Sequence, residues 1–137
     1  MDPVVHFEMP AHDRKRMRTF YEKAFGWKTN QLGKEFGDYV LATTTETDAK
    51  GMIKTPGNIN GGFFQCPEGE QERTRITIAV KDIHAAMKQV EKCGGKVLGG
   101  MGTSGEPDMI PGVGLYANII DSEVNRVSIL QPLEMKK

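Results

Sequence analysis

The stretch HFEMPAHDRKRMRTFYEKAFGW, from His6 to Trp27, decides the fold. It begins within VVHFEM, where apolar residues alternate with His6 and Glu8, and this period of two predicts a half-buried strand. Asp13 then stands where a helix needs an N-cap, and large apolar residues follow at spacings of three and four. The stretch therefore predicts a strand followed directly by a helix that ends at Gly26.

The same pattern returns in the second half of the chain. RITIAV alternates like the first strand, Asp82 is again an N-cap candidate, and an apolar helical stripe runs to Gly94. Three further strands follow each helix: WKTNQ, DYVLATT and INGGFFQ in the first half, and KVLGG, GLYANIID and RVSILQ in the second. An internal repeat is stronger evidence for a fold than any single strand.

The repeat predicts an α+β fold with two βαβββ modules, residues 3–67 and 73–132, in a single domain of residues 1–137. The two sheets are expected to enclose a cavity lined by polar strand positions. The residues predicted to lie under the helices are Val5, Phe7, Met17, Phe20, Phe25, Ile76, Ile78, Met87 and Val90. The Gly-rich segment from Gly99 to Gly114 is predicted to be a mobile loop at the cavity mouth. Its Met101 and Met109 either form an adaptable apolar lid or only stabilise the loop.

Composition excludes several classes of function. Lys and Arg total 18 and Asp and Glu total 18, so the charge does not favour nucleic acid or an anionic membrane. No apolar run approaches a membrane span, and MDPVVHFEMP lacks the features of a signal peptide. We therefore expect a cytoplasmic protein with Cys66 and Cys93 reduced, and with no nucleic-acid or membrane partner.

Several stretches, together with the repeat, resemble the vicinal oxygen chelate superfamily, which includes glyoxalase I, the bleomycin-resistance proteins and the extradiol dioxygenases. These stretches are FYEKAFGW, VKDIHAAMKQVEKCGGKV, IPGVG and DSEVNRVSILQP. The resemblance covers His6 to Pro132 and is nearest to the glyoxalase-like, lactoylglutathione-lyase-related branch. It implies a glyoxalase/bleomycin-resistance/dioxygenase-type fold, a fold that supports many different reactions.

In metal-dependent members of the superfamily, each module offers two ligands from strand positions that face the cavity. By resemblance, His6 takes the first position, Arg75 its counterpart in the second module, and Ser128 the late-strand position. The fourth position falls near Gly62 to Phe64, which carry no donor side chain. Gln65 is the nearest oxygen donor, but it would need a register shift that turns the strand over.

The resemblance therefore implies His6 as a candidate metal ligand but not a complete metal site. A guanidinium at position 75 adds a permanent positive charge, and a serine hydroxyl is a poor donor. We expect no resident cofactor, unless His6 and Glu8 recruit a divalent metal. Without a metal, His6 and Glu8 are the candidate catalytic acid–base pair. The candidate ligand-binding residues are Arg75, Thr77, Tyr39, Tyr116 and Ser128.

These residues also have plainer interpretations. His6 and Glu8 fit polar residues on the solvated face of a half-exposed strand. Arg75 fits a surface ion pair, and the two tyrosines fit packing residues.

Three functions stay open. The first is a glyoxalase-related lyase or isomerase acting on a small oxygenated metabolite, which becomes a metal-dependent lyase or dioxygenase if His6 and Glu8 do bind a metal. The second is a metal-free, ligand-sequestering protein of the bleomycin-resistance kind. The third is an accessory module with an empty cavity. Besides a small-molecule ligand, we expect a homodimer, because two modules alone leave sheet edges open.

Overall fold

The computed structural model describes residues 1–100 and 105–133, within which the chain forms two compact units. The N-terminal unit is His6–Thr74. The C-terminal unit joins Met1–Val5 to the described part of Arg75–Lys137. The first residues belong to the later unit because the backbone N–H of Ala79 donates to the carbonyl of Pro3 at 2.9 Å. Each unit carries one α-helix and its own set of paired strands, and the α+β class is confirmed.

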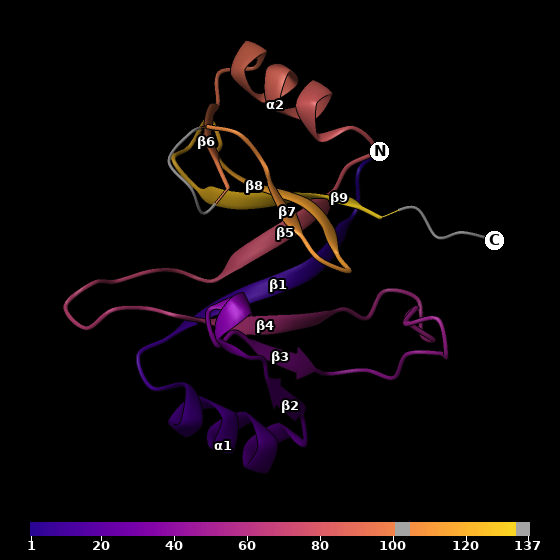
Figure 1. Cartoon of the computed structure of the whole chain (residues 1–137), viewed down its shortest axis with the longest axis vertical. Coiled ribbons are helices and arrows are strands. Elements are labelled where there is room, and N and C mark those ends of the chain that lie inside the picture. Colours follow the sequence, from indigo (N-terminus) through magenta and orange to yellow (C-terminus); the bar gives the residue numbers. More distant parts are fainter. Residues whose placement is uncertain (101–104, 134–137) are drawn as a thin grey trace. The chain divides into compact units, whose positions relative to one another are not determined.

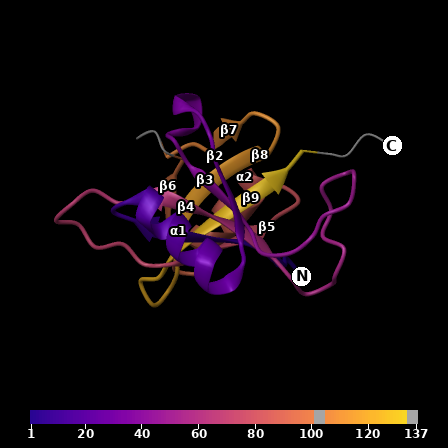
Figure 2. The ribbon, with the colours of Figure 1, turned by 90° about the horizontal axis from the view of Figure 1, so that it is seen from below.

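The N-terminal unit is built in the order strand, helix and three strands. Its elements are β1 (Val4–Ala11), α1 (Arg14–Phe25), β2 (Lys28–Gln31), the short 3-10 helix η1 (Lys34–Phe36), β3 (Val40–Thr43) and β4 (Asn60–Gln65). The strands pair in the order β2-β3-β4-β1, and β1 runs parallel to β4. The helix lies over one face of these strands (Figures 1 and 2). It begins after Asp13, whose Oδ1 accepts from Arg16 N–H at 2.9 Å, and it ends at Gly26 in the left-handed conformation.

The core of this unit lies between α1 and the strands. It consists of Ala11, Val40, Ala42 and Phe63, with Phe7, Met9, Met17, Tyr21 and Trp27 packed against them. Tyr21 stacks on Trp27 with ring centroids 4.5 Å apart and lies 5.5 Å from Phe63. Phe20 and Phe25 were expected in this core, but they are 56% and 64% exposed. Tyr21 and Trp27 already cover Phe63. The rings of Phe20 and Phe25 therefore remain on the outer flank of the aromatic cluster.

The C-terminal unit repeats the order with one extra strand. Its elements are β5 (Arg75–Ala79), α2 (Ile83–Lys92), β6 (Lys96–Gly99), β7 (Asp108–Ile110), β8 (Gly114–Ile120) and β9 (Arg126–Pro132). The strands pair in the order β5-β9-β8-β6, and β7 also pairs with β8. Asp82 Oδ1 caps α2 by accepting from Ala85 N–H at 3.0 Å. The helix packs against β6, β8 and β9 (Figure 1).

A second core lies beneath α2. It consists of Val80, Ile83, Ala117, Ile119 and Ile129, with partly buried residues that include the predicted Ile78, Met87 and Val90. Ile76 and Val5 were also expected under the helices, but they are 42% and 37% exposed. Ile76 lies near the start of β5, which α2 does not cover, and Val5 belongs to the C-terminal unit rather than to the unit of α1.

The segment between Gly99 and Gly114 is not wholly a loop. Asp108–Ile110 form β7 and pair antiparallel with the start of β8. The surrounding glycines and prolines concealed this short strand in the sequence. Met109 is 59% exposed, whereas Met101 lies outside the described residues, so the lid stays a prediction.

A tight turn at Asp121 sets the register of β8 against β9. Its carboxylate accepts from the backbone N–H groups of Glu123 and Asn125 and from the Asn125 side chain, at 2.8, 2.9 and 3.0 Å. These hydrogen bonds, that of the Asn125 side chain foremost, lower the pKa of Asp121. The register that follows places Ser128 opposite Asn118.

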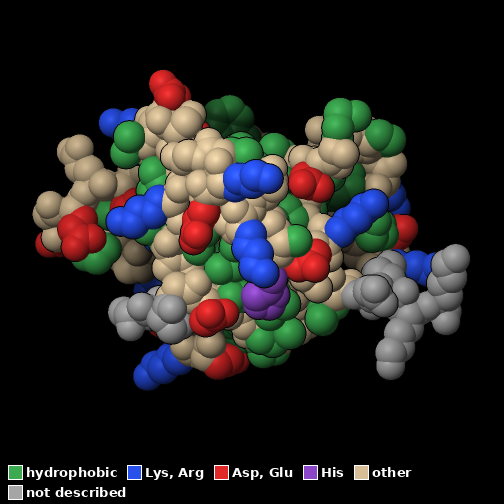
Figure 3. All heavy atoms as spheres, turned by 90° about the horizontal axis from the view of Figure 1, so that it is seen from above, with side chains coloured by type: hydrophobic (Ala, Val, Ile, Leu, Met, Phe, Trp, Pro, Cys, Tyr) green, Lys and Arg blue, Asp and Glu red, His purple; other side chains and the backbone are tan. Residues whose placement is uncertain are grey.

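Charged side chains of both signs are dispersed over the face seen in Figure 3. No helix within the described ranges is long and apolar enough to cross a membrane. Both cysteine thiols are free: Cys66 is buried in the N-terminal unit, and Cys93 is exposed just after α2.

Candidate functional site

A group of polar side chains gathers on the strand face of the N-terminal unit that α1 does not cover. His6 and Glu8 flank Phe7 along β1, and because side chains alternate they face away from the core that Phe7 joins. Gly62 pairs with Glu8 across the parallel β1–β4 ladder and shares its face. Tyr39, directly before β3, completes the group, because its hydroxyl lies 3.1 Å from Nε2 of His6.

The backbone before Tyr39 is held in an uncommon conformation. Gly37 and Asp38 both have positive φ, at 63° and 54°. Arg14, in the first turn of α1, donates to the carbonyls of Gly37 and Asp38 at 3.1 and 2.9 Å. The Tyr39 carbonyl in turn accepts from Leu32 N–H at 2.8 Å. Helix α1 and the residue that follows β2 therefore hold the backbone on either side of the Tyr39 side chain.

Tyr39 fills the space in front of Gly62. A Cβ atom added at position 62 would overlap the ring and hydroxyl of Tyr39. Position 62 therefore needs glycine, and the phenol stands where a side chain from β4 would begin. Gln65 does not compensate for the missing donor, because it lies on the opposite strand face and donates to the carbonyls of His12 and Cys66.

The electrostatics of this group favour a neutral imidazole. Burial lowers the pKa of His6, and the nearby carboxylate of Glu8 offsets part of that shift. Glu8 itself is only 7% exposed. At neutral pH, Nε2 of His6 therefore either accepts the Tyr39 hydroxyl proton or donates its own proton to the phenol oxygen.

The C-terminal unit carries a second polar group, also on the strand face away from its helix. Thr77, Ser128 and Asn118 are direct partners across β5, β9 and β8 and form one row, hereafter the polar row. They are 2%, 0% and 3% exposed. The Tyr116 hydroxyl lies 2.7 Å from Ser128 Oγ, and Asn118 Oδ1 lies 3.3 and 3.2 Å from these two hydroxyl groups.

Arg75 precedes this row on the same face of β5. It lies two residues before Thr77 and is 9% exposed. Since a guanidinium stays charged at any ordinary pH, this face of the C-terminal unit holds a buried positive charge.

The two polar groups occupy equivalent positions in the repeat. The strand pairings align β1 with β5 and β4 with β9. In this alignment His6 corresponds to Arg75, Glu8 to Thr77, Gly62 to Ser128 and Tyr39 to Tyr116. The candidate residues from the sequence thus fall into two sets, one in each unit. Asn118 was missed, and the only sequence signal for it was its alternation with Tyr116.

Comparison with known families decides the assignment. A glyoxalase-like domain matches residues 5–110, most of the chain. The chain belongs to the glyoxalase-like domain family. No curated protein matches its sequence.

Several solved structures share the fold of this glyoxalase-like protein. Methylmalonyl-CoA epimerase in complex with methylmalonyl-CoA and NH4+ has a TM-score of 0.68 at 14% identity, over 100% of this chain and 99% of that one. A variant of the Streptomyces coelicolor epimerase, in complex with 2-nitronate-propionyl-CoA, has a TM-score of 0.67 at 14% identity, over 98% of this chain and 97% of that one. A hypothetical protein from Bacillus halodurans has a TM-score of 0.65 at 13% identity, over 99% of this chain and 98% of that one. At these identities the likeness establishes the fold alone.

The ligand positions of this glyoxalase-like protein do not fit a resident divalent metal. The N-terminal unit offers His6 but has glycine at position 62. The C-terminal unit offers a cation at position 75 and, at Ser128, a neutral hydroxyl already bonded to Tyr116. Within residues 1–100 and 105–133, no three His, Cys, Asp or Glu side chains lie close enough together to hold a metal ion.

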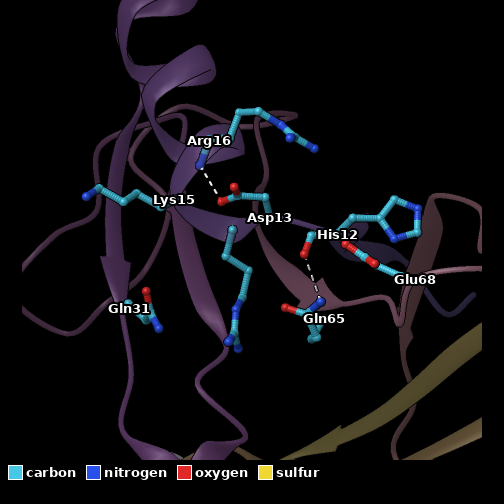
Figure 4. A pocket seen from close by; sticks show the side chains of 8 residues that line it. His12, Asp13, Lys15, Arg16, Gln31, Gln65 and Glu68 are labelled. Atoms are coloured by element: carbon cyan, nitrogen blue, oxygen red, sulfur yellow. Dashed lines mark hydrogen bonds between the residues drawn. The ribbon is translucent and has the colours of Figure 1, made fainter.

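A separate hollow of about 410 Å³ lies beside the start of α1 in the N-terminal unit. It is lined by His12, Asp13, Arg14, Lys15, Arg16, Gln31, Gln65 and Glu68 (Figure 4). Lys15 and Arg16 extend in opposite directions, and Arg14 is already bonded to backbone carbonyls. The basic side chains therefore do not converge on one anion, and none of the candidate site residues lines this hollow.

The contact between Tyr39 and Gly62 can be tested by a double-mutant cycle. We expect Gly62→Ala to lower the free energy of unfolding by about 1–3 kcal/mol, because the new methyl group displaces Tyr39 from His6. In a Tyr39→Ala background the same change should cost less, with a coupling of about 1–2 kcal/mol. Urea denaturation of the four proteins measures it. Gly33→Ala is the matched control, since the atoms nearest to a Cβ there belong to the flexible Glu35 carboxylate. Additive effects of Gly62→Ala and Tyr39→Ala would contradict the contact.

Proposed function

We propose that this glyoxalase-like protein binds a small oxygenated metabolite, and acts on it, without a complete divalent-metal site. The ligand is recognised by polar side chains on a strand face that no helix covers. His6 and Glu8 are the groups able to move a proton, since a neutral imidazole and a carboxylate lie on one strand face.

One observation carries this proposal. Tyr39 lies over Gly62 and bonds to Nε2 of His6, so a phenol stands where a side chain at the fourth ligand position would extend. The same residue thus blocks the neighbouring ligand position and engages one nitrogen of the His6 imidazole. A divalent ion needs several neutral or anionic donors converging on one point.

The C-terminal unit supports the same conclusion independently. Its equivalents of His6 and Gly62 are Arg75 and Ser128. A buried guanidinium repels a divalent cation and attracts an anionic or carbonyl oxygen. The replacement therefore changes the preferred ligand from a metal to an oxygen-bearing organic molecule.

Sequestration without turnover is the second candidate function, and one contact favours it. The Tyr39 hydroxyl engages Nε2 of His6 at 3.1 Å. An acid–base role requires the substrate to displace this hydroxyl or to use it as a proton relay. A protein that only binds its ligand has no such requirement.

Metal titration tests the proposal directly. We expect chelator-treated protein, purified without a His tag, to show no stoichiometric sub-micromolar site for zinc, nickel or manganese. The His6→Ala variant should behave identically, because residues 1–100 and 105–133 bring no three His, Cys, Asp or Glu side chains together. Isothermal titration and elemental analysis provide the measurement. A tight site of one ion per chain that His6→Ala abolishes would restore the metalloenzyme.

Two further expectations from the sequence stay proposals. We propose that the chain acts as a homodimer, which light scattering at tens of micromolar can check. A cytoplasmic location is the setting proposed for a small-metabolite protein of this kind.

A further inference from the structure

The buried polar row of the C-terminal unit is unusual for the interior of a small protein. The core beneath α2 is apolar, yet the opposite strand face carries Thr77, Ser128 and Asn118 side by side, each at most 3% exposed. Burying polar groups costs free energy unless they are hydrogen-bonded. The row therefore calls for a structural or a functional explanation.

Part of the row is explained by its own hydrogen bonds. Ser128 is satisfied by Tyr116 and Asn118, with distances of 2.7 and 3.2 Å. The Tyr116 hydroxyl reaches Asn118 Oδ1 at 3.3 Å as well. These three side chains hold one another in a fixed arrangement on adjacent strands.

Thr77 is the exception. Its Oγ1 is buried and has no hydrogen-bond partner within the described parts of the chain. It faces the same side as Ser128, its direct partner across the parallel β5–β9 ladder. Arg75 lies two residues earlier on the same face, so a hydroxyl donor and a cation are adjacent along one strand.

The two units of the repeat carry different chemical groups at equivalent positions. At the positions equivalent to Arg75 and Thr77, the N-terminal unit carries His6 and Glu8. The C-terminal unit therefore presents a cation and hydroxyl donors, and the N-terminal unit presents a carboxylate and a neutral imidazole. The repeat has diverged into one half suited to holding anionic oxygen and one half suited to accepting protons.

We infer that the polar row of the C-terminal unit is a binding site for the carboxylate of a small ligand, with Thr77 donating a hydrogen bond and Arg75 supplying the charge. This inference rests on the proposed function in taking the ligand to be the same small metabolite. Ser128, Tyr116 and Asn118 position the row rather than complete the contact. Among the candidate residues, Thr77 is thus the one whose hydroxyl serves the ligand and not the fold.

Stability separates a ligand-binding role of Thr77 from a structural one before any ligand is known. Thr77→Val removes the hydroxyl at nearly constant shape. The thermal midpoint of Thr77→Val should equal or exceed that of the wild type, because no protein hydrogen bond is lost. Ser128→Ala is the matched comparison and should lower the midpoint, because its hydroxyl is bonded to Tyr116 and Asn118. If Thr77→Val lowers the midpoint as much as Ser128→Ala does, the hydroxyl is structural and the inference fails.

Ligand binding is tested with pyruvate, acetate and acetamide as probes. Titrations of the full chain are followed by backbone amide shifts in the presence of chelator. Pyruvate and acetate should shift amides along β5 and β9, whereas acetamide, which has a similar shape but no charge, should not. Thr77→Val should weaken pyruvate binding about tenfold or more, the usual effect of losing a hydrogen bond to a charged group.

The outcomes distinguish this inference from the proposed function. Carboxylate binding that persists in chelator but changes less than twofold in Thr77→Val overturns the inference alone. Binding that appears only after a divalent metal is added overturns the proposed function. Absence of binding by both carboxylates, or equal binding of acetamide, overturns the carboxylate site.

Discussion

Phe63→Ala is expected to lower the free energy of unfolding by about 3–5 kcal/mol, the range typical of removing a fully buried phenylalanine. Phe63 is 0% exposed and lies with its ring centroid 5.5 Å from Tyr21 and 6.4 Å from Trp27. Tyr21 and Trp27 are stacked on each other, which limits how far these two rings can move into the cavity. The lost free energy has two sources, the apolar surface that Phe63 buries and its contacts with the aromatic rings.

Trp27 gives this experiment a local readout. It is the only tryptophan in the sequence and belongs to the affected core, so its fluorescence during urea denaturation reports on the N-terminal unit. Phe20→Ala is the matched control, since that ring is 56% exposed, and it should cost about 1 kcal/mol. Equal losses for the two variants would mean that Phe63 is not the centre of this core.

Arg75→Gln is expected to weaken binding of a small carboxylate such as pyruvate roughly 30- to 100-fold, which corresponds to about 2–3 kcal/mol for a charge-assisted contact. Arg75 is buried on the face that carries the polar row, and its fork of donors matches a carboxylate. Arg75→Lys keeps the charge but loses the fork, so its affinity should fall between those of the other two proteins.

The control for Arg75 is an exposed cation of the same unit. Lys88→Gln removes a positive charge on α2, which covers the other face of the strands, and should change pyruvate affinity less than threefold, as expected for an exposed, screened charge. Thermal midpoints of all variants must be compared, because a buried cation also contributes to folding. Equal effects at the two positions would reduce the role of Arg75 to long-range electrostatics.

The sequence predicted the fold well because the deciding signals are local. Asp13 and Asp82 were predicted as N-caps, and both accept hydrogen bonds from the first turns of their helices. Gly26 was predicted to end the first helix and does so at φ 71°. Cap chemistry and periodicity act over a few residues, so one sequence reveals them.

The same signals failed where the outcome depended on neighbours distant in sequence. The helical stripe predicted Phe20 and Phe25 in the core, but stacking of Tyr21 on Trp27 excluded them. Which of these aromatic rings enters the core depends on the three-dimensional packing and not on their spacing in the sequence. The short strand β7 was missed because three residues beside glycine and proline carry no readable period.

The candidate site was predictable in its positions but not in its contacts. Alternation and the repeat identified His6, Tyr39 and Ser128 as residues of interest. That Tyr39 lies over Gly62 depends on the turn held by Arg14 and on the pairing of β3 with β4. Neither the turn nor that pairing leaves a pattern in the sequence around position 39.

Because the two cysteines differ in exposure, a thiol reagent should label them at two different rates. Cys93 is exposed after α2 and should react at once with a thiol reagent, whereas Cys66 is 1% exposed and reacts only in molecules whose N-terminal unit has opened. The slow phase of labelling therefore measures how often the unit that carries His6 and Tyr39 opens. A ligand that binds this unit would slow that phase and leave the fast one unchanged, so its binding could be timed without any assay of turnover.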